Sequence, residues 1–128
     1  MTTEELRRLL EMAARACGIQ VDERGPFTEV PCMQSEFGKG NWIESSRRAW
    51  IPDIDDGDSA RMRSALGIGV AWEPDPSGEI QSLSHVHCMC WRIPHGRSQR
   101  IADHNGDRNA ALRLCALKVA AMIGESMK

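Results

Sequence analysis

Histidine and cysteine side chains gather in one short run, HVHCMC at positions 85–90. Both residue types ligate zinc, so a metal site is the first chemistry to consider. In an extended strand, however, neighbouring side chains point to opposite faces, which places His85 and His87 on one face and Cys88 and Cys90 on the other. A single ion cannot reach all four. We expect a strand with buried thiols and half-exposed imidazoles, and no bound metal.

Two alternatives use the same run of residues. A zinc module would need further ligands, which His95 and His104 could supply on the histidine face and Cys32 on the cysteine face. A thiol nucleophile would need a histidine base within hydrogen-bond reach and an oxyanion hole. No nucleophile elbow surrounds Cys88 or Cys90, and a buried thiol is inert. We therefore expect no enzymatic activity, and the zinc module stays as the alternative.

Aspartates crowd the stretch WIPDIDDGDSARMRSALGI at positions 50–68. They are Asp53, Asp55, Asp56 and Asp58. A calcium loop of the EF-hand type requires glycine at its sixth position and glutamate at its twelfth. Counted from Asp53, those positions hold Asp58 and Ser64. The aspartates instead suit the start of a helix, where carboxylates accept hydrogen bonds from free backbone N–H groups and face the positive end of the helix dipole.

Positive charge gathers on and around the connection before the last expected helix, PHGRSQRIADHN at positions 94–105. The residues that we predict to bind a ligand or a partner are Arg92, His95, Arg97, Arg100, His104 and Arg108. Arg47 and Arg48 are further basic residues that could join them. The N-terminus of the final helix would lie beside this basic loop, a favourable place for an anion. A solvated loop without a ligand is the alternative.

Three helices are expected to position these residues. The first begins at Thr2, whose spacing to Glu5 is that of a capping box, and it ends before Gly18. The second follows the acidic turn and ends before Gly67. The third covers about residues 107–124, where apolar residues recur at helical spacing.

Strand signals occupy much of the remaining chain. Apolar residues alternate over residues 68–72, and the turn sequence EPDPSG at positions 73–78 separates them from a longer strand-like stretch, which predicts a hairpin. The expected strands cover residues 19–21, 27–33, 68–72 and 80–93. Residues 35–48 are interpreted as a loop with room for one short strand, and residues 94–105 as a polar connection.

These elements predict an α+β fold. Three helices and a mainly antiparallel sheet of four to five strands most simply form a single-domain, three-layer α/β/α sandwich, in which helices cover both faces of the sheet. A chain of 128 residues is expected to form one domain that spans residues 1–128.

Composition limits the classes of function. The formal net charge of −2 argues against a protein that grips nucleic acid by neutralising phosphates. Five cysteines, an odd number without regular spacing, are typical of reduced thiols in a cytosol. The start MTTEELRRLL is charged within a few residues, so we expect neither a signal peptide nor a membrane span. A cytoplasmic protein that does not bind a membrane is the expectation.

Four segments carry a resemblance to a known family. They are ELRRLLEMAARACGI at positions 5–19, Trp50 and Pro52 followed by DDGD at positions 55–58, LGI at positions 66–68, and GDRNAALRLCALKVAAMIG at positions 106–124. In order and spacing they resemble the small phage and prophage proteins of the phage ABA sandwich domain family, and more distantly the NinX-type proteins of lambdoid phages. The resemblance implies a three-layer α/β/α fold and a phage or prophage origin. It implies no reaction.

These observations together lead to a functional hypothesis. We expect a small phage accessory protein in the host cytoplasm that has no cofactor and acts by binding a host protein, which it inhibits or modulates. A component of a host defence system is one such target. The first alternative is sequestration of a nucleotide-like or anionic small molecule by the basic loop, and the second is the zinc module. A homodimer stays open, and an exposed Trp42 or Trp72 would favour such an interface.

Overall fold

The structure is a computed structural model that describes residues 2–33, 42–74, 83–93 and 96–127, with the backbone alone for residues 29–33 and 42–47. In chain order the elements are α1 (Thr3–Cys17), β1 (Gln20–Asp22), β2 (Gly25–Met33), β3 (Trp42–Ala49), α2 (Asp56–Leu66), β4 (Gly69–Pro74), β5 (Leu83–Met89), β6 (Arg97–Arg100), the 3₁₀ helix η2 (Ile101–His104) and α3 (Arg108–Ser126). Helices and antiparallel strands together confirm the α+β class.

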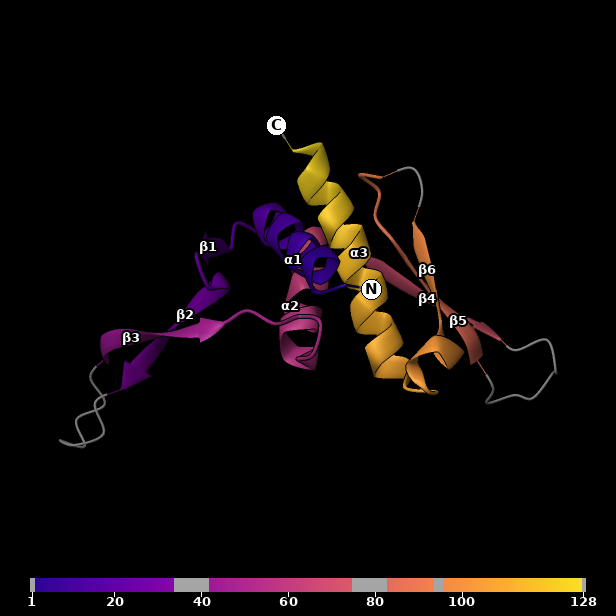
Figure 1. Ribbon diagram of the computed structural model, residues 1–128, viewed down its shortest axis with the longest axis horizontal. Coiled ribbons are helices and arrows are strands. Elements are labelled where there is room, and N and C mark those ends of the chain that lie inside the picture. The colour runs from indigo at the N-terminus through magenta and orange to yellow at the C-terminus, as the bar shows by residue number, and fades with distance from the viewer. Residues whose placement is uncertain (1, 34–41, 75–82, 94–95, 128) are drawn as a thin grey trace.

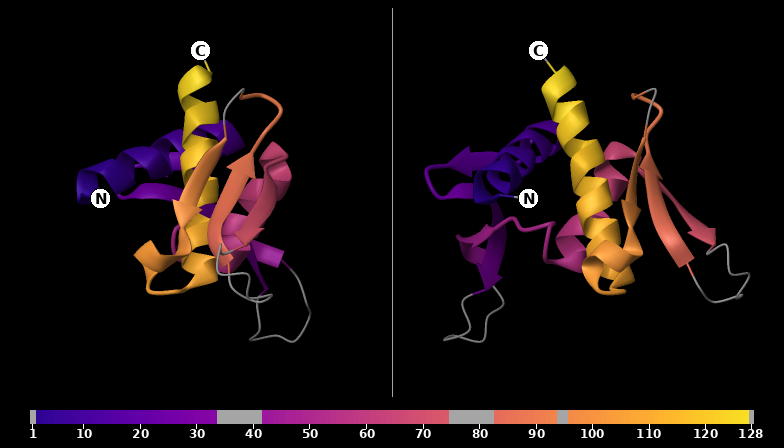
Figure 2. Two further views of the ribbon diagram at one scale, coloured as in Figure 1. Left: turned by 90° about the vertical axis from the view of Figure 1, so that its right-hand side faces the viewer. Right: turned by 45° about the vertical axis from the view of Figure 1, so that its right-hand side comes forward.

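The described strands form two antiparallel sheets instead of one. Each has three strands, in the order β1-β2-β3 and β4-β5-β6. Figure 1 and Figure 2 show α1, α2 and α3 between the two sheets. The expected single sheet of four to five strands, covered by helices on both faces, is therefore wrong. The helices form the middle layer, and the sheets lie outside them.

This arrangement follows from α3, which is apolar around almost its whole circumference. Its buried residues are Ala111, Cys115, Ala116, Leu117, Val119, Ala120, Ala121, Ile123 and Gly124. A helix of this kind must be covered on every side. In the structure α1 and α2 pack on one side of α3, and β5 and β6 pack on the other. Although α3 is apolar, no helix formed by the described residues is long and apolar enough to cross a membrane.

Local signals place the first two helices where the sequence predicts them. Thr2 and Glu5 form both hydrogen bonds of a capping box at the start of α1. Gly18 and Gly67 end α1 and α2 with positive φ angles of 71° and 68°, a conformation that glycine adopts without strain. Asp55 caps α2. The third helix is also confirmed, from Arg108 to Ser126.

The strands are predicted less well. The hairpin of β4 and β5 is confirmed, with Trp72 opposite Val86. The interpretation of residues 94–105 as a connection without strands is wrong, because β6 and η2 lie within it. The segment 35–48 contains most of β3, whereas residues 35–41 lie outside the described part of the chain. The sequence thus allowed for a strand in the region of β3, whereas β6 was missed. Both strands are rich in polar residues, and pairing of β3 with β2 and of β6 with β5 compensates for the lack of an apolar pattern.

The packing of α1 on α3 depends on one glycine. A Cβ atom at Gly124 would lie 1.8 Å from the carbonyl oxygen of Met12 in α1. No flexible side chain is involved in this contact, so a shift of the helix backbone would be needed to relieve it. Gly124 therefore sets how closely the two helices approach.

We expect the substitution Gly124→Ala to lower the free energy of unfolding by about 3 kcal/mol, the upper part of the range for overpacked cores, because helix backbones must move. Urea unfolding followed by circular dichroism measures this. Gly57→Ala in α2 is the matched control, since its Cβ would meet only the ends of the Arg61 and Asp55 side chains, at 3.2 Å. The control should lose no stability. Equal effects at the two positions would contradict the close helix contact.

Candidate functional site

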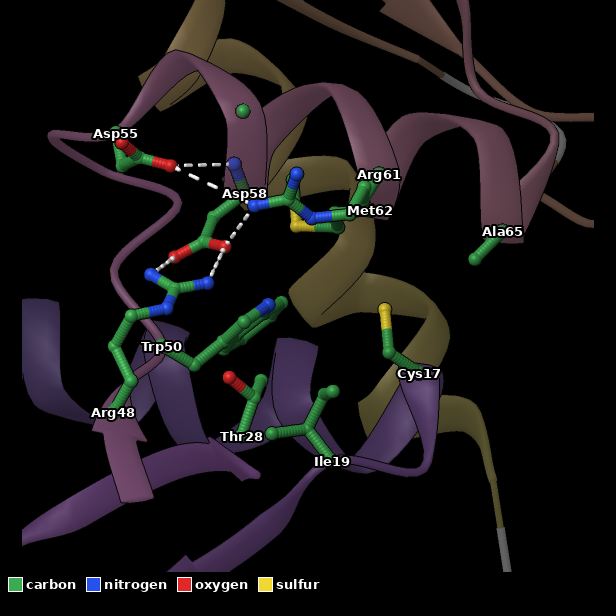
Figure 3. Close-up of a pocket in the computed structure, with 11 residues that line it drawn as sticks. Cys17, Ile19, Thr28, Arg48, Trp50, Asp55, Asp58, Arg61, Met62 and Ala65 are labelled. Atoms are coloured by element: carbon green, nitrogen blue, oxygen red, sulfur yellow. Dashed lines mark hydrogen bonds and ion pairs between the residues drawn. The ribbon is translucent and has the colours of Figure 1, made fainter. Parts of the chain in front are cut away.

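The first turn of α2 buries one carboxylate, that of Asp58. Asp55 caps the helix by accepting a hydrogen bond of 2.7 Å from the backbone N–H of Asp58. The Asp58 side chain points back towards the end of β3 and is fully buried (Figure 3). The interpretation of the acidic turn as a helix start is therefore confirmed.

Four hydrogen bonds satisfy the Asp58 carboxylate. The guanidinium of Arg48 donates two of them, at 2.7 and 3.0 Å, in a bidentate pair. Arg61 donates one at 2.7 Å, and the backbone N–H of Ile51 donates one at 3.0 Å. Charge-assisted bidentate pairs are among the strongest hydrogen bonds in proteins. Asp58 thus ties together β3, the link that follows it, and α2.

The charge state of Asp58 follows from these contacts. Burial alone would raise the pKa of the carboxyl group, because it disfavours the charged form. The hydrogen bonds from Arg48, the Ile51 N–H and Arg61, together with the charge of Arg48, outweigh burial and lower the pKa to about 2. Asp58 is therefore ionised at neutral pH and is saturated with donors, which suits a structural anchor.

A cleft of about 820 Å³ opens beside Asp58, between α2 on one side and the end of α1, β2 and the end of β3 on the other. Figure 3 shows its two ends. Arg48, Asp55 and Arg61 form a polar end, whereas the side chains of Ile19 and Met62 and the ring of Trp50 belong to the apolar lining. Its volume lies within the usual range for small-molecule pockets. The cleft was not predicted from the sequence, although the acidic turn at its rim was.

Arg48 lies in the cleft and not with the basic loop. It was expected only as a residue that could join the basic loop, but its guanidinium lies in the cleft on the Asp58 carboxylate. Arg113 of α3 also contacts the acidic turn. It donates a hydrogen bond of 2.6 Å to Asp56 and one of 2.9 Å to the carbonyl of Asp53, so α2 is fixed to α3.

Cys17 is the thiol that lines the cleft. Burial raises the pKa of this thiol to about 11. Since the thiolate is the reactive form, Cys17 is almost entirely protonated and a poor nucleophile at neutral pH. The cleft is therefore better suited to binding than to covalent chemistry.

The histidine and cysteine strand has the expected alternation. Cys88 and the following Cys90 are buried, whereas His85 and His87 are half-buried on the other face of β5. The Cys90 thiol donates to the carbonyl of Leu66 at 3.3 Å. A hydrogen bond with Cys115 and burial raise the pKa of Cys88. Both thiols of the run are structural in this arrangement.

The two imidazoles form a small polar cluster on the outer face of the sheet. Their ring centroids lie 6.4 Å apart, and His87 contacts a carboxylate oxygen of Glu73 at 3.0 Å and the hydroxyl of Ser98. Among the residues that the structure describes, no three His, Cys, Asp or Glu side chains are placed to hold a metal ion. The further ligands of the zinc alternative include His95 and the Cys32 side chain, which lie outside the described part of the chain.

The predicted basic site is spread along the chain instead of being gathered at one point. Arg97 and Arg100 lie at the two ends of β6 and, three residues apart, on opposite faces of it. Arg92 lies before β6, whereas His104 and Arg108 follow it in η2 and at the start of α3. His95 lies outside the described residues. In the chain, β6 thus lies between Arg92 on one side and His104 and Arg108 on the other.

An exposed apolar surface, which was not predicted from the sequence, lies at the end of β5. Trp91 is 84% exposed, and Met89 beside it is also exposed. The guanidinium carbon of Arg92 lies 5.3 Å from the centroid of the Trp91 ring, within the range of a cation–π contact. We call Met89, Trp91 and Arg92 the Trp91 patch. An exposed indole next to hydrophilic strand ends gives no periodic signal in the sequence, so only the structure reveals it.

Comparison with known proteins places no further constraint on the site. No family model matches the chain, and neither a curated protein nor a solved structure matches it.

The depressed pKa of Asp58 makes stability depend on pH. Since the folded pKa of about 2 is below the ordinary 3.8, the stabilisation is complete above about pH 4 and is lost as the pH falls towards 2. A shift of this size corresponds to about 2 kcal/mol. In urea unfolding, the stability gap between the natural protein and Asp58→Asn should narrow by about this amount from pH 5 to pH 2. A gap that is constant over this range would contradict the role of Asp58.

Proposed function

We propose that the chain is a small phage accessory protein that acts in the host cytoplasm by binding a host protein, which it inhibits or modulates. The observation that supports binding is the Trp91 patch. An indole that is 84% exposed leaves a large apolar surface in water. Such a surface gains free energy when a partner covers it. The phage origin rests on the sequence resemblance alone.

The residue types of the patch support a protein as the partner. Tryptophan and arginine are the residues that most often dominate the binding energy of protein interfaces. In the free protein Arg92 already lies over the Trp91 ring, so little side-chain freedom is lost on binding. A Cβ atom at Gly96 would lie 2.3 Å from the carbonyl oxygen of Cys88, so the chain just before β6 passes close to β5 near the patch.

The charges around the patch indicate the chemistry of the partner. Arg92, Arg97 and Arg100 are all exposed. Arg97 is paired with Cys88 and Arg100 with His85, so their side chains lie on opposite faces of the sheet and do not converge on one small anion. Arg97 and Arg100 therefore do not form a common site for the alternative ligand, an anionic small molecule held by the basic loop, whereas Arg92 beside Trp91 favours an acidic group on a partner protein.

We further propose that the function involves no catalysis. The thiol of Cys17 has a pKa of about 11, and that of Cys88 is raised by its hydrogen bond with Cys115 and by burial. Asp58 accepts hydrogen bonds from two arginines and from a backbone N–H. These groups are thus poor candidates for nucleophile or base.

The test of the partner site is affinity capture from a bacterial host lysate, followed by binding of the purified captured protein. Trp91→Ala and Arg92→Glu should weaken that binding about 10-fold or more, as substitutions at interface hot spots do. Ile54→Ala is the matched control, because Ile54 is an apolar side chain that is 66% exposed elsewhere on the surface. The control should bind as the natural protein does. Undiminished binding by Trp91→Ala would refute the patch as the contact.

A homodimer is favoured by a separate observation. Trp72 is 38% exposed, and it lies on β4, which among the described strands pairs with β5 alone and so forms an edge of its sheet. An edge strand with unpaired backbone groups can pair with the same strand of a second copy.

We therefore expect light scattering at high micromolar concentration to give the mass of a dimer. Trp72→Glu should give a monomer. In a dimer formed by pairing of two β4 strands, the glutamates of the two copies would lie near the two-fold axis and repel each other. Ile54→Glu, which adds the same charge away from β4, should stay dimeric. A monomer at every concentration of the natural protein would exclude pairing through β4.

A further inference from the structure

The geometry points to a second binding site in the cleft beside Asp58, for a small organic molecule that combines a flat apolar body with a single carboxylate. This site is independent of the Trp91 patch, and it goes beyond the proposed partner binding. This assignment is supported by the size of the cleft, the chemistry of its two ends, the hydrogen-bonding groups of its lining and its balance of charge.

The size and the apolar lining fit the body of such a ligand. A volume of about 820 Å³ is large enough for a molecule of two fused rings with a short side chain. Ile19 and Met62, from opposite walls, and the ring of Trp50 line the cleft (Figure 3). An aromatic body between these walls would gain free energy from apolar burial and from stacking.

Two hydrogen-bonding groups without partners among the described residues lie in the same lining. Trp50 is 4% exposed, and its indole nitrogen is not one of the buried atoms that lack a partner, so this N–H is open to the cleft. The nitrogen of the ring points into the cleft (Figure 3). The hydroxyl oxygen of Thr28 is also buried and has no partner among the described residues. A buried polar group without a partner is unfavourable, so a ligand that supplies an acceptor is stabilised here.

The arginines at the polar end supply further donors. Arg61 uses one terminal nitrogen for Asp58, and its side chain is 66% exposed. A guanidinium has five N–H groups in a planar fork that matches a carboxylate. The carboxylate of Asp58 keeps Arg48 and Arg61 together at one end of the cleft. Since the guanidinium N–H groups that remain free at this end are hydrogen-bond donors, a ligand must supply the acceptors.

The local charge indicates one negative charge on the ligand. Two arginines, Arg48 and Arg61, stand against two aspartates, Asp55 and Asp58, so the formal charges of the four side chains cancel. The N-terminus of α2 adds roughly half a positive charge. A carboxylate is compatible with this balance, whereas the second charge of a phosphate dianion would lack compensation in a partly buried site.

The test uses 1-naphthoate as the probe, added to the full chain labelled with ¹⁵N. The protein has four tryptophans, and Trp50→Phe identifies the indole N–H signal of Trp50 in the NMR spectrum. We expect 1-naphthoate to shift this signal in a saturable way. Arg61→Gln should raise the Kd about 5- to 10-fold, as the loss of a charged hydrogen bond does. Arg7→Gln is the matched control, because Arg7 is equally exposed, at 62%, and lies on α1 away from the cleft.

Two analogues of the probe test the ligand class. Neutral 1-naphthamide and the dianion 1-naphthyl phosphate should both bind more weakly than 1-naphthoate. Equal binding of the amide would show that the carboxylate is not recognised, and tighter binding of the phosphate would overturn the single-charge argument. No shift of the Trp50 signal at millimolar 1-naphthoate, or an unchanged Kd in Arg61→Gln, would overturn the site. In this variant Asp58 keeps three of its four hydrogen bonds, the two from Arg48 and the one from the Ile51 N–H, so the turn beside the cleft stays anchored.

Discussion

The structure depends on the burial of α3 from every side. Nine of its residues are buried, and they lie around the whole helix instead of forming one stripe. One sheet can cover only one side of such a helix, so α1, α2 and a second sheet must supply the rest. This requirement explains why the strands form two three-stranded sheets with the helices between them. Gly124 lets α1 approach closely enough to complete the cover.

A second constraint fixes the chain where it passes from one sheet to the other. Between β3 and α2 the chain turns within a few residues, and Asp58 holds this turn through Arg48, the Ile51 N–H and Arg61. Arg113 then fixes the start of α2 to α3 through Asp56. Salt bridges on a surface contribute little, but a buried and fully hydrogen-bonded carboxylate specifies one arrangement of its partners. The shape of the cleft follows from that arrangement.

Sequence signals predicted the parts of the fold that depend on neighbouring residues. The capping box of Thr2 and Glu5, the cap at Asp55 and the glycine at position 67 each mark a helix end through a local hydrogen bond or backbone angle. The alternation of histidines and thiols on β5 is local as well, and it is confirmed. The strand β6 was missed because its sequence, RSQR, has no apolar face, and its pairing with β5 decides its conformation.

The layers and the cleft could not be predicted in the same way, because they depend on contacts between distant residues. The cleft brings together Cys17, Thr28, Arg48 and Arg61, which lie in four different elements. Nothing in the sequence near Arg48 distinguishes a partner of Asp58 from a member of the basic loop. Exposure of Trp91 likewise depends on where β5 ends against its neighbours, and an apolar residue in a strand-like stretch is more often buried.

The same contacts bear on what the molecule can do. Several chemically reactive groups among the described residues take part in holding the fold. Asp58 accepts hydrogen bonds from two arginines, the Cys90 thiol donates to the Leu66 carbonyl, and His87 contacts Glu73 and Ser98. The groups left for a ligand or a partner differ in kind. They are the exposed indole of Trp91, the inward-facing indole N–H of Trp50 and the spare guanidinium donors of Arg61. Apolar surface and hydrogen-bond donors recognise other molecules without changing them, so the proposed functions are both forms of binding.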